Sequence, residues 1–96
     1  MSRSQIERKL RGVSEQLRSL REDLSVSDEQ LVQLADEADD ARLRALVSET
    51  PLAEKEHRKA SRHVERLRKH RERIATRIDA LDAEQDALLD RLSASS

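Results

Sequence analysis

Three histidines are the side chains in this chain that could most readily hold a metal ion. His57, His63 and His70 could do so if a helix placed ligands three or four residues apart on one face. They are instead six and seven residues apart, and none has a carboxylate or second histidine four residues further on. We therefore predict no metal site, and the absence of cysteine excludes disulfides and thiolate ligands.

Carboxylates are plentiful, but acidic pairs on a solvated helix surface are common and do not indicate catalysis. No arrangement of serine, histidine and acid has a pocket in which to converge. A coiled coil of two helices cannot exclude water from a reaction centre. We expect no enzymatic activity, no cofactor and no small-molecule substrate.

Six cations recur at helical spacing in the second half of the chain, and we call them the basic stripe. They could follow a phosphate backbone or an acidic protein. Against nucleic-acid binding, the chain has no aromatic residue to stack on bases, and acidic residues lie nearby at 36, 39 and 40. An ordinary solvated face is the alternative. The stripe comprises Arg58, Lys59, Arg62, Arg66, Lys69 and Arg73.

Four apolar residues lie close to the middle of the chain, and we call them the turn cluster: Leu43, Leu46, Val47 and Leu52. The first three occupy outward positions of the repeat described below, which a lone coiled coil fills with polar residues. Exposed apolar clusters often mark interaction sites, so we expect this one to bind a protein partner. The alternative is that the cluster folds over the turn and covers the end of the helix pair.

The composition predicts which elements carry these residues. Of the 96 residues, 41% are charged and none is aromatic, and there is one glycine and one proline. Such a composition with an apolar period is typical of long helices and coiled coils. No apolar run approaches the ~18 residues of a membrane span, and the N-terminal residues do not form a signal peptide. We expect a cytoplasmic protein that binds no membrane.

Leucines or residues that replace them, most of them apolar, recur every three then four residues from Ile6 to Ala45, and again from Ala53 to Leu92. In heptad notation (a to g) these are the a and d positions of a coiled-coil seam. The two runs are out of phase, so the helix must break between them. We predict an all-α fold in which two long helices form an antiparallel coiled-coil helical hairpin. The predicted single domain has helices at about 4–47 and 51–92, a turn at about 48–50 and a frayed tail at 93–96.

Capping residues support these boundaries. Thr50 is a favourable N-cap, and Pro51 suits the first position of a helix. Ser4 and Glu7 match a capping box that would start the first helix. Ser27 also opens such a box, but the heptad phase continues through it, so we predict one unbroken helix there.

Folding the chain near residue 49 sets the register. Leu17 then faces Leu81, and Leu24 faces Ile74. One polar layer interrupts the middle of the seam, where Arg71 lies opposite Ser27. It is either a weak point that opens when a partner binds or an arginine that reaches out of the seam and specifies register.

Five pairs of opposite charge flank this seam, while Lys9 and Arg91 repel each other. The five are Asp28–Arg68, Arg42–Glu54, Asp23–Arg77, Glu37–His63 and Arg44–Glu56.

Two assemblies remain open at this point. Two chains could exchange second helices, as in domain swapping, and make the same contacts. Val26, Val32 and Leu89 also point outward, so two hairpins could pair into a four-helix bundle. We therefore expect a weak homodimer.

The run from Ala35 to His57, ADEADDARLRALVSETPLAEKEH, resembles small uncharacterised coiled-coil proteins encoded in actinobacteria. The resemblance covers about a quarter of the chain and implies no activity. In outline the chain is also similar to the helical hairpins of transcript-cleavage factors, although its turn is apolar where theirs carries metal-binding acids. The basic stripe suggests the alternative function, a nucleic-acid-binding factor that is associated with the ribosome or RNA polymerase.

Overall fold

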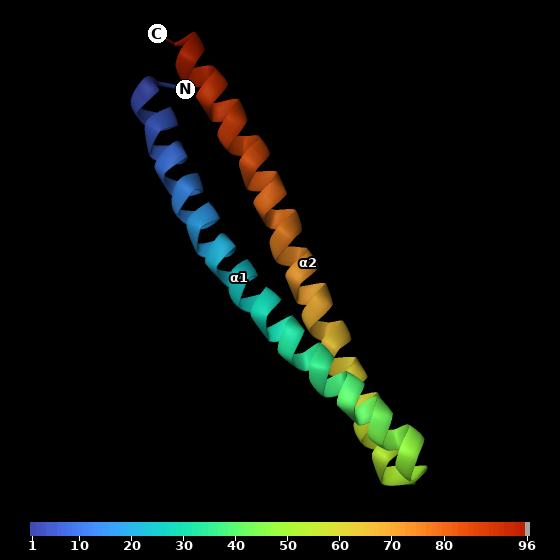
Figure 1. Ribbon diagram of the computed structural model, residues 1–96. Helices are drawn as coiled ribbons and strands as arrows, with labels where there is room; N and C mark the ends of the chain where they lie inside the picture. The colour runs from blue at the N-terminus through green and yellow to red at the C-terminus, as the bar shows by residue number, and fades with distance from the viewer. Residues whose placement is uncertain (96) are drawn as a thin grey trace. The chain divides into compact units, whose positions relative to one another are not determined.

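A computed structural model describes residues 1–95 and contains two long antiparallel helices joined by a short turn (Figure 1). Helix α1 spans Arg3–Ser48 and helix α2 spans Pro51–Ala94. The predicted helical hairpin is confirmed. Helix α2 continues two residues further than predicted, so Ser93 and Ala94 are helical. Ser96, the last residue of the predicted frayed tail, lies outside the described residues.

The seam follows the heptad pattern throughout both helices. Every a and d position, from Ile6 to Ala45 in α1 and from Ala53 to Leu92 in α2, is buried or half-buried. Apolar residues repeating every seven positions keep one face of each helix against the other, and their burial is the main favourable term. The predicted heptad phase of both helices is therefore confirmed.

The chain divides into two compact units, which we name the terminal unit and the turn unit. The terminal unit comprises Met1–Leu24 and Arg73–Ser96, and the turn unit comprises Ser25–Glu72. Each unit contains a segment of α1 packed against a segment of α2.

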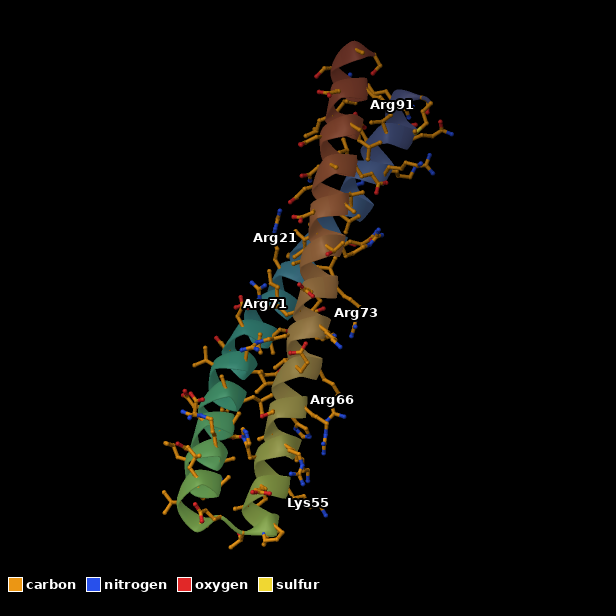
Figure 2. The ribbon with its side chains drawn as sticks, turned by 90° about the vertical axis from the view of Figure 1, so that its right-hand side faces the viewer. Arg21, Lys55, Arg66, Arg71, Arg73 and Arg91 are labelled. Atoms are coloured by element: carbon orange, nitrogen blue, oxygen red, sulfur yellow. The ribbon has the colours of Figure 1, made fainter. Side chains whose placement is uncertain are left out.

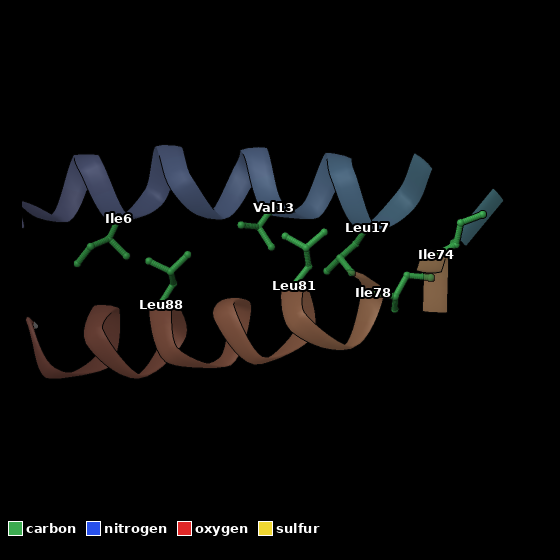
Figure 3. Packing of buried hydrophobic residues seen from close by; sticks show 7 residues of the cluster. All are labelled: Ile6, Val13, Leu17, Ile74, Ile78, Leu81 and Leu88. Atoms are coloured by element: carbon green, nitrogen blue, oxygen red, sulfur yellow. The ribbon is translucent and has the colours of Figure 1, made fainter. Parts of the chain in front are cut away.

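The terminal unit contains the main apolar core. Leu17 and Leu81 are each only 1% exposed and pack against each other across the seam (Figure 3). Their neighbours Leu10, Leu20, Leu24 and Leu92 are partly buried against the same cluster. The other buried members of the cluster are Ile6, Val13, Ile74, Ile78 and Leu88.

The turn unit has a thinner core. Its buried residues are Ala41, Val64 and Ser27, of which only Val64 is a large apolar side chain. Alanines occupy most of the seam positions near the turn, and all of them except Ala41 are half-buried. Because an alanine removes little apolar area from water, each layer here contributes less than a leucine layer of the terminal unit.

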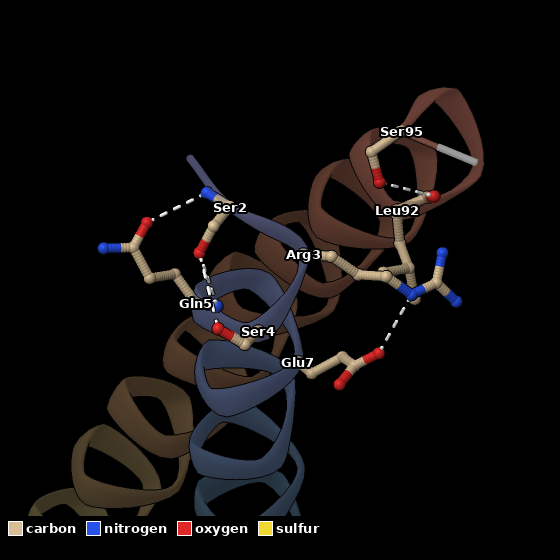
Figure 4. Close-up of polar contacts among 7 residues, drawn as sticks. All are labelled: Ser2, Arg3, Ser4, Gln5, Glu7, Leu92 and Ser95. Carbon is tan, nitrogen blue, oxygen red and sulfur yellow. Dashed lines mark hydrogen bonds and ion pairs between the residues drawn. The ribbon is translucent and has the colours of Figure 1, made fainter.

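The start of α1 differs from the prediction. Ser2, not Ser4, caps the helix: its Oγ accepts the Gln5 backbone N–H at 3.3 Å, and its own N–H donates to Gln5 Oε1 at 2.9 Å (Figure 4). This is a capping box shifted two residues upstream. Glu7 instead accepts a hydrogen bond from Arg3 Nε at 3.2 Å. The predicted Ser4–Glu7 box was wrong because Ser2-Arg3-Ser4-Gln5 satisfies the same spacing and adds two residues to the helix.

The turn is formed by Glu49 and Thr50. Glu49 has φ of 51°, the left-handed conformation that commonly ends a helix. Thr50 Oγ1 then accepts the Ala53 backbone N–H at 3.2 Å, which confirms it as the N-cap of α2.

The five predicted charge pairs across the seam do not form within residues 1–95. The ion pairs in this part of the chain are Arg3–Glu7, Arg21–Asp82 and Arg71–Asp28. Asp28 thus pairs with Arg71 instead of Arg68, and Arg77 donates to Gln16 Oε1 at 3.4 Å instead of reaching Asp23. These predictions were wrong because long exposed side chains gain little from any one pairing and several partners lie within reach.

Candidate interaction surfaces

The turn cluster is exposed. Leu43, Leu46, Val47 and Leu52 are 52%, 63%, 85% and 66% exposed. They therefore do not fold over the turn to cover the end of the seam, which was the alternative interpretation. All four lie in the turn unit, on the last turns of α1 and the first turn of α2. The turn chemistry positions them, because Glu49 ends one helix and Thr50 starts the next within two residues.

Five members of the basic stripe lie on α2 in the turn unit, from Arg58 to Lys69, and all are exposed. In this unit Arg66 points away from α1 (Figure 2). Among residues 1–95, none of the five side chains forms an ion pair or a hydrogen bond. The sixth member, Arg73, is exposed but belongs to the terminal unit.

Lys55 extends this surface toward the turn and was missed in the sequence analysis. It is exposed and points away from α1, as Arg66 does (Figure 2). Helical periodicity could have found it: Lys55 is three residues before Arg58 and four before Lys59, so the three side chains share one face.

The polar layer of the seam lies in the turn unit. Ser27 is 3% exposed, while Arg71 is half-buried and donates its Nε–H to Asp28 Oδ1. This hydrogen bond and, secondarily, the charge of Asp28 raise the pKa of Arg71 above its ordinary value. The guanidinium group of Arg71 therefore lies outside the seam, as predicted for an arginine that specifies register.

Two surface hollows flank the seam near the turn. One of about 330 Å³ is lined by Arg42, Ala45 and Leu46 of α1 and by Glu54, His57 and Arg58 of α2. The other, of about 340 Å³, is lined by Glu37, Asp40, Ala41, Arg44, Glu56 and Ala60. Arg42 and Glu54 thus share one hollow, and Arg44 and Glu56 share the other, without coming within ion-pair distance.

His57 occupies a seam position beside one of these hollows. Its Nδ1 is buried and has no hydrogen-bond partner within the described part of the chain. Across residues 1–95, no group of three or more histidines and carboxylates is arranged to hold a metal ion. In the same residues, neither helix combines the length and apolar character needed to cross a membrane.

The outward apolar residues beyond the turn cluster are also exposed. Val26 and Val32 in the turn unit are 52% and 66% exposed, and Leu89 in the terminal unit is exposed as well.

Comparison of the chain with protein-family models, with curated proteins and with solved structures gave no match.

Proposed function

We propose that this chain is a non-enzymatic helical-hairpin interaction protein that binds a protein partner through the turn cluster. The supporting observation is that Leu43, Leu46, Val47 and Leu52 all remain exposed within ten residues of one another. Exposed apolar residues concentrated in one place favour a site that is covered by a partner. A cytoplasmic location remains part of this proposal.

The energetics indicate what such a partner must supply. Fully burying an exposed leucine or valine side chain contributes roughly 1.5–3 kcal/mol, and because these four are already partly buried they contribute at most roughly 6–12 kcal/mol in total. Association itself costs an estimated 4–15 kcal/mol. The cluster alone would therefore support weak binding, and a tight partner must also contact the polar residues around it. An apolar groove with a polar rim fits this requirement.

The test is recovery of binding partners from a lysate by the wild-type chain and by a variant carrying Leu43→Glu and Val47→Glu. A variant carrying Val26→Glu and Val32→Glu is the matched control, because it places two charges at exposed valines outside the cluster. Circular dichroism checks that all three chains remain helical. We expect the first variant to lose a specific partner that the control retains. Equal recovery by a folded first variant would refute the proposal.

A second candidate function is binding of a polyanion, such as RNA, through the basic stripe. It is supported by the five stripe cations of the turn unit, which are exposed and form no ion pair within the described residues. Neutralising about five phosphates of a single strand gives a slope of about −3.5 for log K against log salt concentration.

Titration of labelled RNA and duplex DNA at low and physiological salt tests this candidate. The variant Arg62→Glu with Arg66→Glu should bind far more weakly at low salt. Its control is Arg44→Glu with Arg68→Glu, which changes the net charge equally at cations outside the stripe. Absence of binding by the wild type at low salt would eliminate the candidate.

A further inference from the structure

Charge in the turn unit is separated between its two helices. The α1 segment carries six carboxylates and two arginines, whereas the α2 segment carries eight lysines and arginines and four carboxylates. Within the unit, Arg71–Asp28 is the one ion pair across the seam among described residues. The remaining opposite charges are thus available to a partner.

Four carboxylates of α1 form what we call the acidic row: Glu29, Asp36, Asp39 and Asp40. All are exposed. Glu29 and Asp36 are seven residues apart, and both lie opposite the seam in the heptad repeat, with Asp39 and Asp40 on either side of that line. Together the row occupies roughly 100° of the helix surface.

Four cations of α2 form an equivalent basic row: Arg58, Lys59, Arg62 and Lys69. They are also exposed, and Arg62 and Lys69 are seven residues apart on the side of α2 opposite the seam. The two rows therefore lie on opposite faces of the turn unit, each pointing away from the other helix.

The two rows also match in level along the helices. The Arg71–Asp28 hydrogen bond places these two residues at nearly the same level. Counting from them along the antiparallel helices, Glu29 is within one residue of the level of Lys69, and Asp36 is within one residue of the level of Arg62. Asp39 and Asp40 are likewise within one residue of the levels of Lys59 and Arg58. Every member of the acidic row thus has a cation within about 1.5 Å of its own level on the opposite face.

From this match we infer that a second copy of the chain docks on the turn unit, side by side and in the same orientation. The acidic row of one copy contacts the basic row of the next. Helix α1 of one copy is then antiparallel to α2 of its neighbour, and contacts form at levels about 10.5 Å apart on both helices. The contact is heterologous, so it leaves one free row at each end and can extend to a third copy.

A polyanion accounts for less of this arrangement. It would contact the basic row only, and the acidic row at the same levels would have no role in its binding. A second copy uses both rows. Charge complementarity selects which faces meet, because two acidic rows or two basic rows would repel each other, and the matched levels favour the same orientation for both copies. Exposed pairs are individually weak and are screened by salt, so the association is weak and strongest at low ionic strength.

The experiment measures mass by light scattering and sedimentation velocity at high protein concentration. The wild type should exceed the monomer mass at low salt and approach it when the ionic strength is raised about tenfold. Two charge-reversal variants remove one row each: Glu29→Lys with Asp36→Lys, and Arg62→Glu with Lys69→Glu. Each variant alone should remain monomeric. The control Arg44→Glu with Arg68→Glu should associate much more strongly than the Arg62→Glu, Lys69→Glu variant, although both change the net charge equally.

Mixing the two reversal variants gives the decisive result. The reversed row of each then complements a row of the other, so the mixture should regain at least half of the mass increase of the wild type. A monomeric wild type at low salt, or a mixture that stays monomeric, would overturn the inference. Association that persists in both reversal variants would also overturn it and would assign the contact to apolar residues. RNA binding without self-association would assign the basic row to a polyanion. This result is independent of the partner-recovery experiment on the turn cluster.

Discussion

Arg71 emerges from a seam position of α2 and donates its Nε–H to Asp28 of α1, beside the buried hydroxyl side chain of Ser27. The seam therefore contains a polar layer whose charged end is satisfied at the surface. Such a layer costs stability relative to an apolar one, but it aligns the two helices in one register.

Replacing Arg71 tests this balance. The substitution Arg71→Leu should raise the melting temperature by a few degrees, because an apolar side chain then fills the layer. Asp28→Ala, which removes the partner without filling the seam, should lower it slightly. Thermal unfolding followed by circular dichroism measures both. A less stable Arg71→Leu variant would mean that the hydrogen bond contributes more than apolar packing at this layer.

The same pair determines a pH response. The pKa of Arg71 is raised in the folded chain. The stabilisation that the Arg71–Asp28 interaction contributes is therefore fully present below the pKa of an unfolded arginine, and it is lost only as the pH rises beyond that pKa. We therefore expect the difference in melting temperature between the wild type and Asp28→Ala to stay constant from neutral to mildly alkaline pH. A difference that decreases over this range would indicate that another titrating group controls the pair.

The capping box at the start of α1 gives different roles to two serines that are close in sequence: Ser2 caps the helix, and Ser4 lies inside it. Ser2→Ala should lower the free energy of unfolding by about 1 kcal/mol, since the Gln5 backbone N–H then loses its acceptor. Ser4→Ala should change it less, because Ser4 is already inside the helix and its hydroxyl only contacts Ser2 Oγ at 3.4 Å. Urea unfolding of the two variants measures the contrast. The reverse order of stabilities would restore Ser4 as the cap.

Glu49 is strained at the turn. A residue with a β-carbon in the left-handed region costs roughly 1–2 kcal/mol, and glycine avoids this cost while losing roughly 0.5–1 kcal/mol in unfolded-chain entropy. We expect Glu49→Gly to raise the free energy of unfolding by about 0.5–1 kcal/mol. The neighbouring Ser48→Gly is the control and should lower it, because Ser48 is helical. A destabilising Glu49→Gly would show that the glutamate side chain itself supports the turn.

A disulfide can test whether the hairpin closes within one chain. Leu20 packs on the cluster that contains Ile78 in the terminal unit, so cysteines at these two positions should lie within the ~7 Å between Cα atoms that a disulfide requires. With no native cysteine to compete, Leu20→Cys with Ile78→Cys should oxidise to a monomer at micromolar concentration. Non-reducing gel electrophoresis and mass spectrometry identify the product.

In the control pair, Leu20→Cys with Leu92→Cys, the second cysteine lies 14 residues further along α2 than position 78. This pair should not form a disulfide within one chain. A linked dimer from the first pair would instead demonstrate domain-swapped chains. No oxidation of the first pair in a helical chain would refute the register.

The sequence by itself determined the two helices and the face of each that forms the seam. These follow from apolar positions such as Leu17 and Leu81, because a seven-residue period leaves only one face of each helix that can be buried. The break between the helices at Thr50-Pro51 could also be predicted from the sequence, because helix capping depends only on neighbouring residues. Exposure of Leu43 and Val47 was predicted from their outward heptad positions, but the alternative of folding over the turn could not be excluded without the structure.

Only the tertiary structure decided which polar groups meet. Ser2 and Ser4 both fit a capping box by spacing, and the choice depended on where α1 actually begins. Asp28 had Arg68 and Arg71 within reach, and the structure pairs it with Arg71. The physical reason is the same in each case. Burying a leucine in the seam is more favourable than leaving it exposed by roughly 1.5–3 kcal/mol, so the seam is determined. Alternative exposed polar contacts differ in free energy by only a few tenths of a kcal/mol, so periodicity does not choose between them. Periodicity therefore predicts the seam, while the surface contacts depend on the exact placement of side chains in the folded pair.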